Sequence, residues 1–437
     1  NFSESFILKK LRDLQSNSKS GKVTLIGHSN GGLVIKALIQ KLKDANDPLY
    51  NQIDKVILVA TPQVGTPEGF LSLLHGTRLA AFGAVMTATN NRYLAENMPT
   101  TYNLLPSKGY FDIQGDPSLN LNKIITFPNH ELFSKQTEKY GTEISNFTEF
   151  KDFILGKEGR EKPTGDDLDN ANNGNENLYN NAEKIHQMLD NWQAPENTKV
   201  IQVAGWGIKT FAGIEYMAKK YGEKCEFGIC GIPIIKPFPK TKTSFEGYET
   251  VVTSSALWMN TDANTERWWV DLKKEGGFFE KDRTHKDILE VSNLRNFIKA
   301  EIKDASFSDP ENIIVNSKPN YSLSEMKTDI VLNLYSGGYV YISDSTGRIT
   351  GIVNGETKEE IPNSRYMEVG NTKYISVEEG IKYTVHIDGN NQEMILLDVD
   401  KEINGIVSET KSLQTESKER ITLDLSATFD LQALTIN

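Results

Sequence analysis

The chain has 437 residues, of which 38% are hydrophobic, 24% charged and 9% aromatic, a composition typical of a soluble globular protein long enough for more than one domain. The formal net charge of −11 argues against nucleic acid as a partner, because phosphate binding needs an excess of Lys and Arg on one face. No stretch approaches the roughly 20 consecutive apolar residues of a membrane-spanning helix, which excludes an integral membrane protein.

The chain opens with an alternation of helix and strand patterns. Asn1 leads into an amphipathic helical pattern with no initiator methionine or signal peptide, so we expect that further residues precede it. A buried strand at 23–26, a helix at 32–42 and a second apolar strand at 55–60 follow. Strands that are apolar on both faces and separated by helices are typical of a parallel sheet, so this part is predicted to be α/β.

A possible nucleophile lies between the first strand and the helix after it, in the G-x-S-x-G motif Gly27-His28-Ser29-Asn30-Gly31. The strand–turn–helix context is that of a nucleophile elbow, which lifts Ser29 to the carboxyl end of the sheet. Side chains in place of Gly27 and Gly31 would be expected to collide with neighbouring backbone. The helix N-terminus points to the same place, so the Asn30 N–H is predicted to stabilise an oxyanion. The alternative, a phosphate-binding turn, lacks the accompanying Lys-Ser/Thr or G-x-G-x-x-G.

The apolar stretch at 78–89 has two interpretations. It is either a lid or lipid-contacting surface, or a buried helix packed on the sheet, and the second is favoured because helices that are apolar all round are usually core. Residues 156–181 are rich in Asn, Gly and Asp and predict a polar loop or insertion. A helix over 181–192 and a strand over 200–205 then return the chain to the α/β pattern.

The C-terminal part has a different pattern. Beyond about residue 310 the sequence shows short alternating strands separated by turn signals, which predict an all-β, sandwich-like domain over 312–437 after an α/β domain over 1–305. The two cysteines, Cys225 and Cys230, are too few for a disulfide framework or a zinc site, and their spacing permits either a disulfide or two free thiols.

A nucleophilic serine needs a base, which a carboxylate orients in turn. In α/β-hydrolases the chain order is serine, acid, histidine. Five of the six histidines are disfavoured, because they lie in the elbow, before any plausible acid, on a predicted helix face or in the β-sandwich pattern: His28, His75, His130, His186 and His386. His285, in a loop that runs into a helix after the last α/β strand, is therefore the predicted base.

Several segments in order resemble the lecithin:cholesterol acyltransferase family of α/β-hydrolases, with related bacterial lipases and GPI inositol-deacylases. The segments are LIGHSNGG, VILVATPQVGTPEGF, MPTTYNLLP, GWGIKT and GYETVVTSSAL, followed by the late His285, and they cover roughly residues 20–300. The resemblance implies a mostly parallel α/β-hydrolase sheet whose first strands, with the second oxyanion donor, lie upstream of Asn1. It also implies a lipid or other acyl-ester substrate, no cofactor or metal, a possible contact with a membrane or lipid surface, and an extracellular or cell-envelope location.

One position departs from the family pattern. The family usually has G-D-G-T-V where this chain has GYETV, so Tyr248 stands at the position of the catalytic Asp. Glu249, one residue later at the end of an expected strand, is the predicted acid, with Glu246 and Asp262 as alternatives. A shift of one residue in a strand turns a side chain to the opposite face unless a bulge re-aims it.

Two functions from different classes follow. The favoured one is a serine hydrolase or O-acyltransferase that acts on carboxylic esters through Ser29, His285 and an acid, without a cofactor. The other is a catalytically degenerate hydrolase scaffold in a cell-surface binding protein, and Tyr248 at the acid position is its main support.

Overall fold

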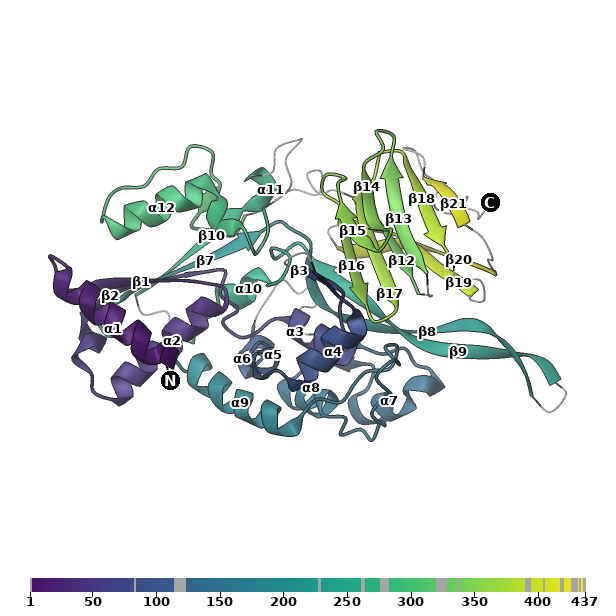
Figure 1. Cartoon of the computed structure of the whole chain (residues 1–437), viewed down its shortest axis with the longest axis horizontal. Coiled ribbons are helices and arrows are strands. Elements are labelled where there is room, and N and C mark those ends of the chain that lie inside the picture. The colour runs from purple at the N-terminus through teal and green to yellow at the C-terminus, as the bar shows by residue number, and fades with distance from the viewer. Residues whose placement is uncertain are drawn as a thin grey trace.

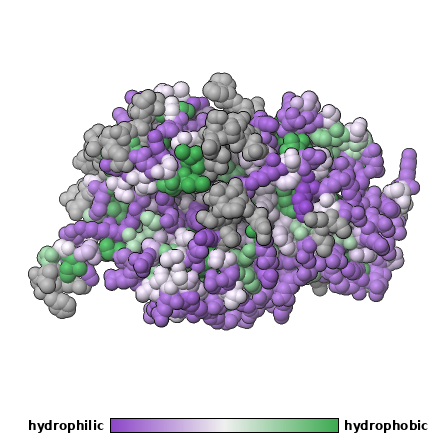
Figure 2. Space-filling view, turned by 180° about the vertical axis from the view of Figure 1, so that it is seen from behind, coloured by the Kyte–Doolittle hydropathy of each residue, from purple (hydrophilic) through white to green (hydrophobic). Residues whose placement is uncertain are grey.

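A computed structural model of the chain describes all residues except 1, 82–83, 114–122, 227–228, 261–263, 276–282, 320–327, 336–337, 390–393, 404, 417–419, 426–430, 432–433 and 435–437. An α/β part with the N-terminal helices lies beside a β-rich C-terminal part, and a long two-stranded ribbon extends along both (Figure 1). On the face shown in Figure 2 the surface is mostly hydrophilic, with apolar residues gathered in small patches.

The central sheet has the strand order β1-β2-β7-β10-β11. Its strands are β1 (Val23–His28), β2 (Ile53–Val59), β7 (Lys199–Trp206), β10 (Thr265–Asp271) and β11 (Ile314–Val315). Three of the four pairings are parallel and the last, β10 with β11, is antiparallel. All but one residue of β2 is buried, because helices cover both faces of the sheet at this strand.

Two apolar clusters flank this sheet. On one face α1 (Phe2–Asn17) and α2 (Asn30–Asp44) pack Leu11, Leu38 and Ile39 against the strands. On the other, α12 (Ser292–Ile302) buries Leu294 and Phe297. The short elements η1 (Pro48–Gln52), α10 (Thr253–Ala256), α11 (Leu272–Glu275) and η4 (Ile288–Glu290) connect the layers.

A helical region lies between β2 and β7 in sequence. Its elements are α3 (Pro67–Leu74), α4 (Ala88–Asn97), α5 (Pro99–Asn103), α6 (Lys108–Phe111), η3 (Glu131–Phe133), α7 (Ser134–Tyr140), α8 (Phe147–Ile154) and α9 (Glu176–Asp190), with the short strands β5 (Ile125–Thr126) and β6 (Glu143–Ile144). A cluster rich in aromatic side chains, including Phe70, Phe150 and Tyr216, forms its core.

The polar segment at 156–181 is partly helical. Its last residues form the first turns of α9, because the Asn175 side chain caps this helix by accepting from the N–H groups of Asn177 and Leu178. Arg92, a buried residue of α4, holds the preceding loop. Its guanidinium donates to four loop carbonyls: Thr164, Gly165, Asp167 and Asn170.

The apolar stretch at 78–89 does not form the predicted helix. It contains two short antiparallel strands, β3 (Leu79–Ala81) and β4 (Ala84–Met86), before α4 begins. At its start the chain pairs with the C-terminal domain: Thr77, the residue before the stretch, bridges to Val369, and Arg78 N donates to the Glu368 carbonyl. Those edge contacts favour the extended backbone over the helix that composition alone predicts.

The two-stranded ribbon of Figure 1 was absent from the sequence prediction. Strands β8 (Thr210–Glu226) and β9 (Ile229–Ser244) form a long antiparallel hairpin, which joins β5 and β6 in a four-stranded sheet. Near its end Cys225 and Cys230 form a disulfide, so the first of the two possibilities left open by the sequence is the one found.

The C-terminal domain consists of two five-stranded antiparallel sheets around one apolar core. One has the order β16-β17-β12-β19-β20 and the other β15-β14-β13-β18-β21. The bounds are β12 (Thr328–Leu334), β13 (Tyr339–Asp344), β14 (Ile349–Val353), β15 (Glu356–Glu359), β16 (Arg365–Val369), β17 (Thr372–Glu378), β18 (Tyr383–Asp388), β19 (Met394–Ile403), β20 (Ile406–Glu416) and β21 (Arg420–Leu425). Alternate burial along β18 places one side of the strand in the core, as in a sandwich.

Buried ion pairs connect the ribbon to this domain. Three lysines of the α/β part, one just before β8 and two on the hairpin, reach carboxylates on β12 and β19: Lys209 to Asp329 and Glu402, Lys219 to Asp398, and Lys240 to Asp400. The Asp400 side chain is fully buried and that of Glu402 is 4% exposed. Because isolated charges are costly to bury, these pairs hold the two domains in one relative position.

Candidate active site

Ser29 lies at a strained turn between β1 and α2. Its φ of 55° and ψ of −133° fall outside the regions that non-glycine residues prefer, as expected for a nucleophile elbow. Its backbone N–H donates to the Val59 carbonyl at the end of β2, which fixes the turn against the sheet. Asn30 is the first residue of α2 and is exposed, so its N–H belongs to the unpaired amides at a helix N-terminus.

Of the two motif glycines, one behaves as predicted and the other does not. A Cβ on Gly27 would lie 2.7 Å from the Gly32 nitrogen, in agreement with the expected collision. A Cβ on Gly31 would meet nothing within 4 Å, so the collision predicted there is wrong. The close approach occurs at Gly32 instead, where a Cβ would overlap the Thr61 side chain.

The predicted base reaches the nucleophile. Nε2 of His285 lies 2.7 Å from Oγ of Ser29, within hydrogen-bond distance. Burial, and to a smaller extent the neighbouring His28, lower the pKa of His285 to about 4. The imidazole is therefore neutral at physiological pH, as a group that accepts a proton from serine must be.

Three contacts hold the loop and ring of His285. The backbone N–H donates to the Tyr248 carbonyl at 3.0 Å, and the carbonyl lies 2.8 Å from Nε2 of His28. Since a carbonyl only accepts, Nε2 of His28 is the donor. The Tyr248 ring stacks on the imidazole with centroids 5.5 Å apart and planes 18° from parallel. From the sequence, His28 was expected only to belong to the elbow, and no sequence pattern indicates its contact with the distant His285.

Neither Glu249 nor Glu246, the two described candidates for the acid, is hydrogen-bonded to His285. Nδ1 of His285 is buried and has no hydrogen-bond partner among the described residues. Glu249 is not at the end of a strand: it lies in a loop at φ 85°, and its N–H donates to the Thr210 hydroxyl. Glu246 is paired with Lys318, and Asp262 lies outside the described residues.

Glu249 interacts instead with a carboxylate that the sequence did not single out. Burial first, and the charge of Glu249 second, raise the pKa of Glu68 to about 7. Glu68 is in the first turn of α3 and hydrogen-bonds the Thr250 side chain. Two carboxylates this close resist simultaneous ionisation, so Glu68 is protonated more readily than an exposed glutamate.

The family model of the lecithin:cholesterol acyltransferases matches residues 3–290. The chain belongs to this family. Family membership supports an esterase or acyltransferase in general, in agreement with the resemblance carried by the sequence motifs.

Comparison with solved structures adds little. The Tle4–Tli4 complex matches at 17% identity over 60% of this chain and 56% of that chain, with a TM-score of 0.31. The Bacillus licheniformis lipase BlEst2 in its propeptide form matches at 12% identity over 99% of this chain and 85% of that chain, with a TM-score of 0.29. The chain thus spans little more than half the length of the first structure, and both TM-scores are too low to indicate a shared overall fold. No curated protein matches the chain.

Tyr248 stands where the lecithin:cholesterol acyltransferase family usually has its catalytic Asp, and the structure shows how this side chain is placed. Tyr248 is fully buried, and its hydroxyl has no hydrogen-bond partner among the described residues. Burial raises the pKa of its hydroxyl well above the ordinary value, so the residue is neutral and brings no negative charge to His285. The side chain at the position of the family's acid therefore contacts the base by ring stacking.

A buried lysine lies on the helix that follows the nucleophile. Lys36 is fully buried. Its Nζ donates to the Gln63 side chain and lies 5.5 Å from the centre of the Trp192 ring. Burial lowers its pKa to about 8, opposed by the negative charge of Asp190. Leu33 and Ile39, which lie near it in α2, are also buried. The apolar periodicity of this helix could therefore have indicated from the sequence that Lys36 is buried.

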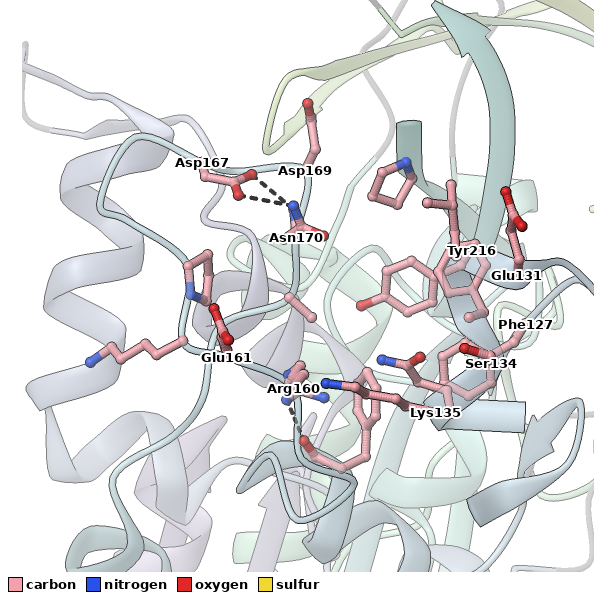
Figure 3. Close-up of a pocket in the computed structure, with 18 of the residues that line it drawn as sticks. Phe127, Glu131, Ser134, Lys135, Arg160, Glu161, Asp167, Asp169, Asn170 and Tyr216 are labelled. Atoms are coloured by element: carbon pink, nitrogen blue, oxygen red, sulfur yellow. Dashed lines mark hydrogen bonds between the residues drawn. The ribbon is translucent and has the colours of Figure 1, made fainter. Parts of the chain in front are cut away.

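A cavity of about 690 Å³ lies elsewhere, between the loop at 160–171 and η3 and α7 (Figure 3). Neither Ser29 nor His285 lines it. Figure 3 shows Asp167 and Asn170 on one wall and Ser134 on the other. Two of its basic side chains are already paired with carboxylates that do not line the cavity: Arg160 with Glu158 and Lys162 with Glu96.

Over the described residues, no group of three or more His, Cys, Asp or Glu side chains could hold a metal ion. Among the described helices, none is long and apolar enough to cross a membrane.

Proposed function

We propose that this chain is a serine hydrolase or O-acyltransferase that removes the acyl group of a lipid or other carboxylic ester by forming an acyl-enzyme on Ser29. The single observation that carries the proposal is the 2.7 Å separation of the Ser29 hydroxyl and Nε2 of His285 at a strained elbow. Membership of the lecithin:cholesterol acyltransferase family supports the same class of chemistry.

The proposed reaction has two halves. In the first, Oγ of Ser29 attacks the ester carbonyl while Nε2 of His285 takes the hydroxyl proton, and the Asn30 N–H binds the oxyanion. The tetrahedral intermediate collapses with loss of the alcohol, which receives the proton from His285. In the second half, water or an acceptor alcohol attacks the acyl-enzyme, gives its proton to His285 and releases the acid or a new ester.

Covalent labelling with a fluorophosphonate probe tests the proposal, using the complete gene product with Ser29→Ala and His285→Ala as variants. The proposal expects the wild type to be labelled, Ser29→Ala to be unlabelled, and His285→Ala to be labelled at least about a hundredfold more slowly. Hydrolysis of p-nitrophenyl esters of increasing chain length would then identify the preferred acyl group. A folded wild-type protein that is not labelled would exclude the proposal and leave a binding role for the same scaffold.

A location outside the cell or in the cell envelope, and contact with a lipid surface, belong to the same proposal. They rest on the family resemblance. Flotation with phosphatidylcholine vesicles would test the contact, and protein that stays at the bottom of the gradient would contradict it.

A further inference from the structure

The base of the candidate site has an unusual set of neighbours. Nδ1 of His285 is buried without a hydrogen-bond partner among the described residues, where a triad would place a carboxylate. Two residues nevertheless hold the loop and the ring of this histidine: His28, the neighbour of the nucleophile in β1, and Tyr248, at the position of the family's acid.

We infer that His28 and Tyr248 are positioning residues, which hold the loop and the ring of His285 against Ser29. The inference rests on the proposed function and deepens it.

His28 connects the base to the nucleophile through the backbone. Its ring N–H donates to the His285 carbonyl at 2.8 Å, while its own backbone is continuous with Ser29. A movement of the elbow is therefore transmitted to the base loop, and the 2.7 Å contact between the two reacting atoms is kept. Positioning of this kind is worth a large part of a catalytic barrier, because small displacements of reacting groups cost orders of magnitude in rate.

Tyr248 constrains the base in two further ways. Its carbonyl accepts from the His285 N–H, and its ring lies nearly parallel to the imidazole, so rotation of the imidazole out of this plane would lose the stacking contact. The Tyr248 side chain is fully buried, so its own position is fixed by packing. The hydroxyl makes no hydrogen bond to a described residue, and the proposed role therefore belongs to the ring.

Both proton transfers of the reaction run through Nε2 of His285. When Nε2 takes the proton of Ser29, Nδ1 keeps its own hydrogen, and the same Nε2 proton passes to the departing alcohol. Among the described residues, the titratable or charged groups next to His285 are His28 from β1, Tyr248 from the loop before α10, and Arg283, Lys286 and Asp287 on its own loop. Asp287 is occupied by the N–H and hydroxyl of Thr284.

Matched pairs of variants test the inference in the complete gene product. Tyr248→Phe keeps the ring and Tyr248→Leu removes it, whereas His28→Gln keeps a side-chain N–H donor and His28→Ala removes it. The expected result is a roughly tenfold to hundredfold loss of kcat in Tyr248→Leu and His28→Ala, with KM changed less than about threefold, and near-normal kcat in Tyr248→Phe and His28→Gln. Thermal unfolding of each variant checks that it is folded.

A readout that a merely structural role would not move is the acid limb of the pH–rate profile. Because His28 contributes to the lowered pKa of His285, the limb should move to higher pH in His28→Ala.

Two outcomes would overturn the inference. One is an unchanged kcat in both Tyr248→Leu and His28→Ala. The other is a loss in Glu249→Gln or Glu68→Gln as large as in His285→Ala, which would show that a carboxylate orients the base after all. If Ser29→Ala abolishes fluorophosphonate labelling of an active wild type, the proposed function stands whatever these variants show. If the wild type is never labelled, the proposed function itself fails.

Discussion

Oγ of Ser29 and Nε2 of His285 are 2.7 Å apart although 256 positions separate the two residues in the chain. The contact joins the end of the first strand of the sheet to a loop that precedes the last helix of the α/β part. Ser29 is half-buried, and Asn30, the next residue, is exposed.

The pH dependence of the reaction should reflect the lowered pKa of His285. The imidazole must be neutral to accept the serine proton, and burial with the neighbouring His28 brings its pKa to about 4. The acid limb of kcat/KM should therefore have its midpoint near pH 4 instead of near 6.5, the ordinary value for histidine.

Measurement of kcat/KM for a soluble p-nitrophenyl ester between pH 3.5 and 8 checks this, over the range in which unfolding is excluded by circular dichroism at each pH. A midpoint between 6 and 7 would contradict the expectation and would indicate that His285 is more hydrated in solution.

The buried ion pairs between the domains should be far more important for stability than exposed pairs of the same ribbon. Lys209→Ala leaves Asp329 and Glu402 buried without their cation, which should cost about 3–5 kcal/mol of unfolding free energy. The matched control is Lys220→Ala, which breaks an exposed pair with Glu223 on the same hairpin and should cost less than about 1 kcal/mol.

Differential scanning calorimetry of the two variants measures the comparison, and the two domains can be followed as separate transitions if they uncouple. Equal, small shifts in both variants would mean that solvent reaches the Lys209 cluster.

The α/β part could be predicted from sequence because its signals are local. The apolar strand ending at His28, the glycines around Ser29 and the helix after them lie within one continuous segment, and period and turn chemistry suffice to define it. The alternating strands of the C-terminal domain were visible for the same reason.

Other features depend on partners distant in the chain. The hairpin strand β8 carries Lys219 and other charged residues, whose sequence pattern suggests exposure to solvent. The acidic partner of Lys219, Asp398, is 179 positions away in the chain. The contact of Tyr248 with His285 depends on a loop conformation in which Glu249 adopts a positive φ. Hydrophobic periodicity does not reveal such a turn. Glu249 was predicted as the acid because it follows the position of the family's Asp at the end of an expected strand, whereas in the structure it lies in a loop and is not hydrogen-bonded to His285.

Lys36 should give the protein a measurable alkaline dependence of stability. Its pKa is about 8 in the folded chain and about 10.5 when unfolded, so between these pH values the unfolded chain binds a proton that the folded chain has released. The unfolding free energy of the wild type should therefore rise with pH in this window, relative to Lys36→Met, by up to about 3 kcal/mol.

Urea unfolding at pH 7, 8, 9 and 10 gives the difference. Lys43→Met, an exposed position of the same helix, is the control and should run parallel to the wild type. A constant difference between wild type and Lys36→Met across the series would show that Lys36 stays protonated, paired with Asp190.

Alanine at the two adjacent glycines of α2 should have opposite effects. A Cβ on Gly32 overlaps the Thr61 side chain at the end of β2, so Gly32→Ala should destabilise the fold by about 1–3 kcal/mol and displace the elbow, with slower fluorophosphonate labelling. A Cβ on Gly31 meets open space within a helix, so Gly31→Ala should be neutral or stabilising by up to about 1 kcal/mol. Thermal unfolding gives the sign at each position. If Gly31→Ala unfolds at the wild-type temperature or above but is labelled more slowly, the open space beside Gly31 is needed by the substrate, whereas a loss of stability there would contradict the packing described for this turn.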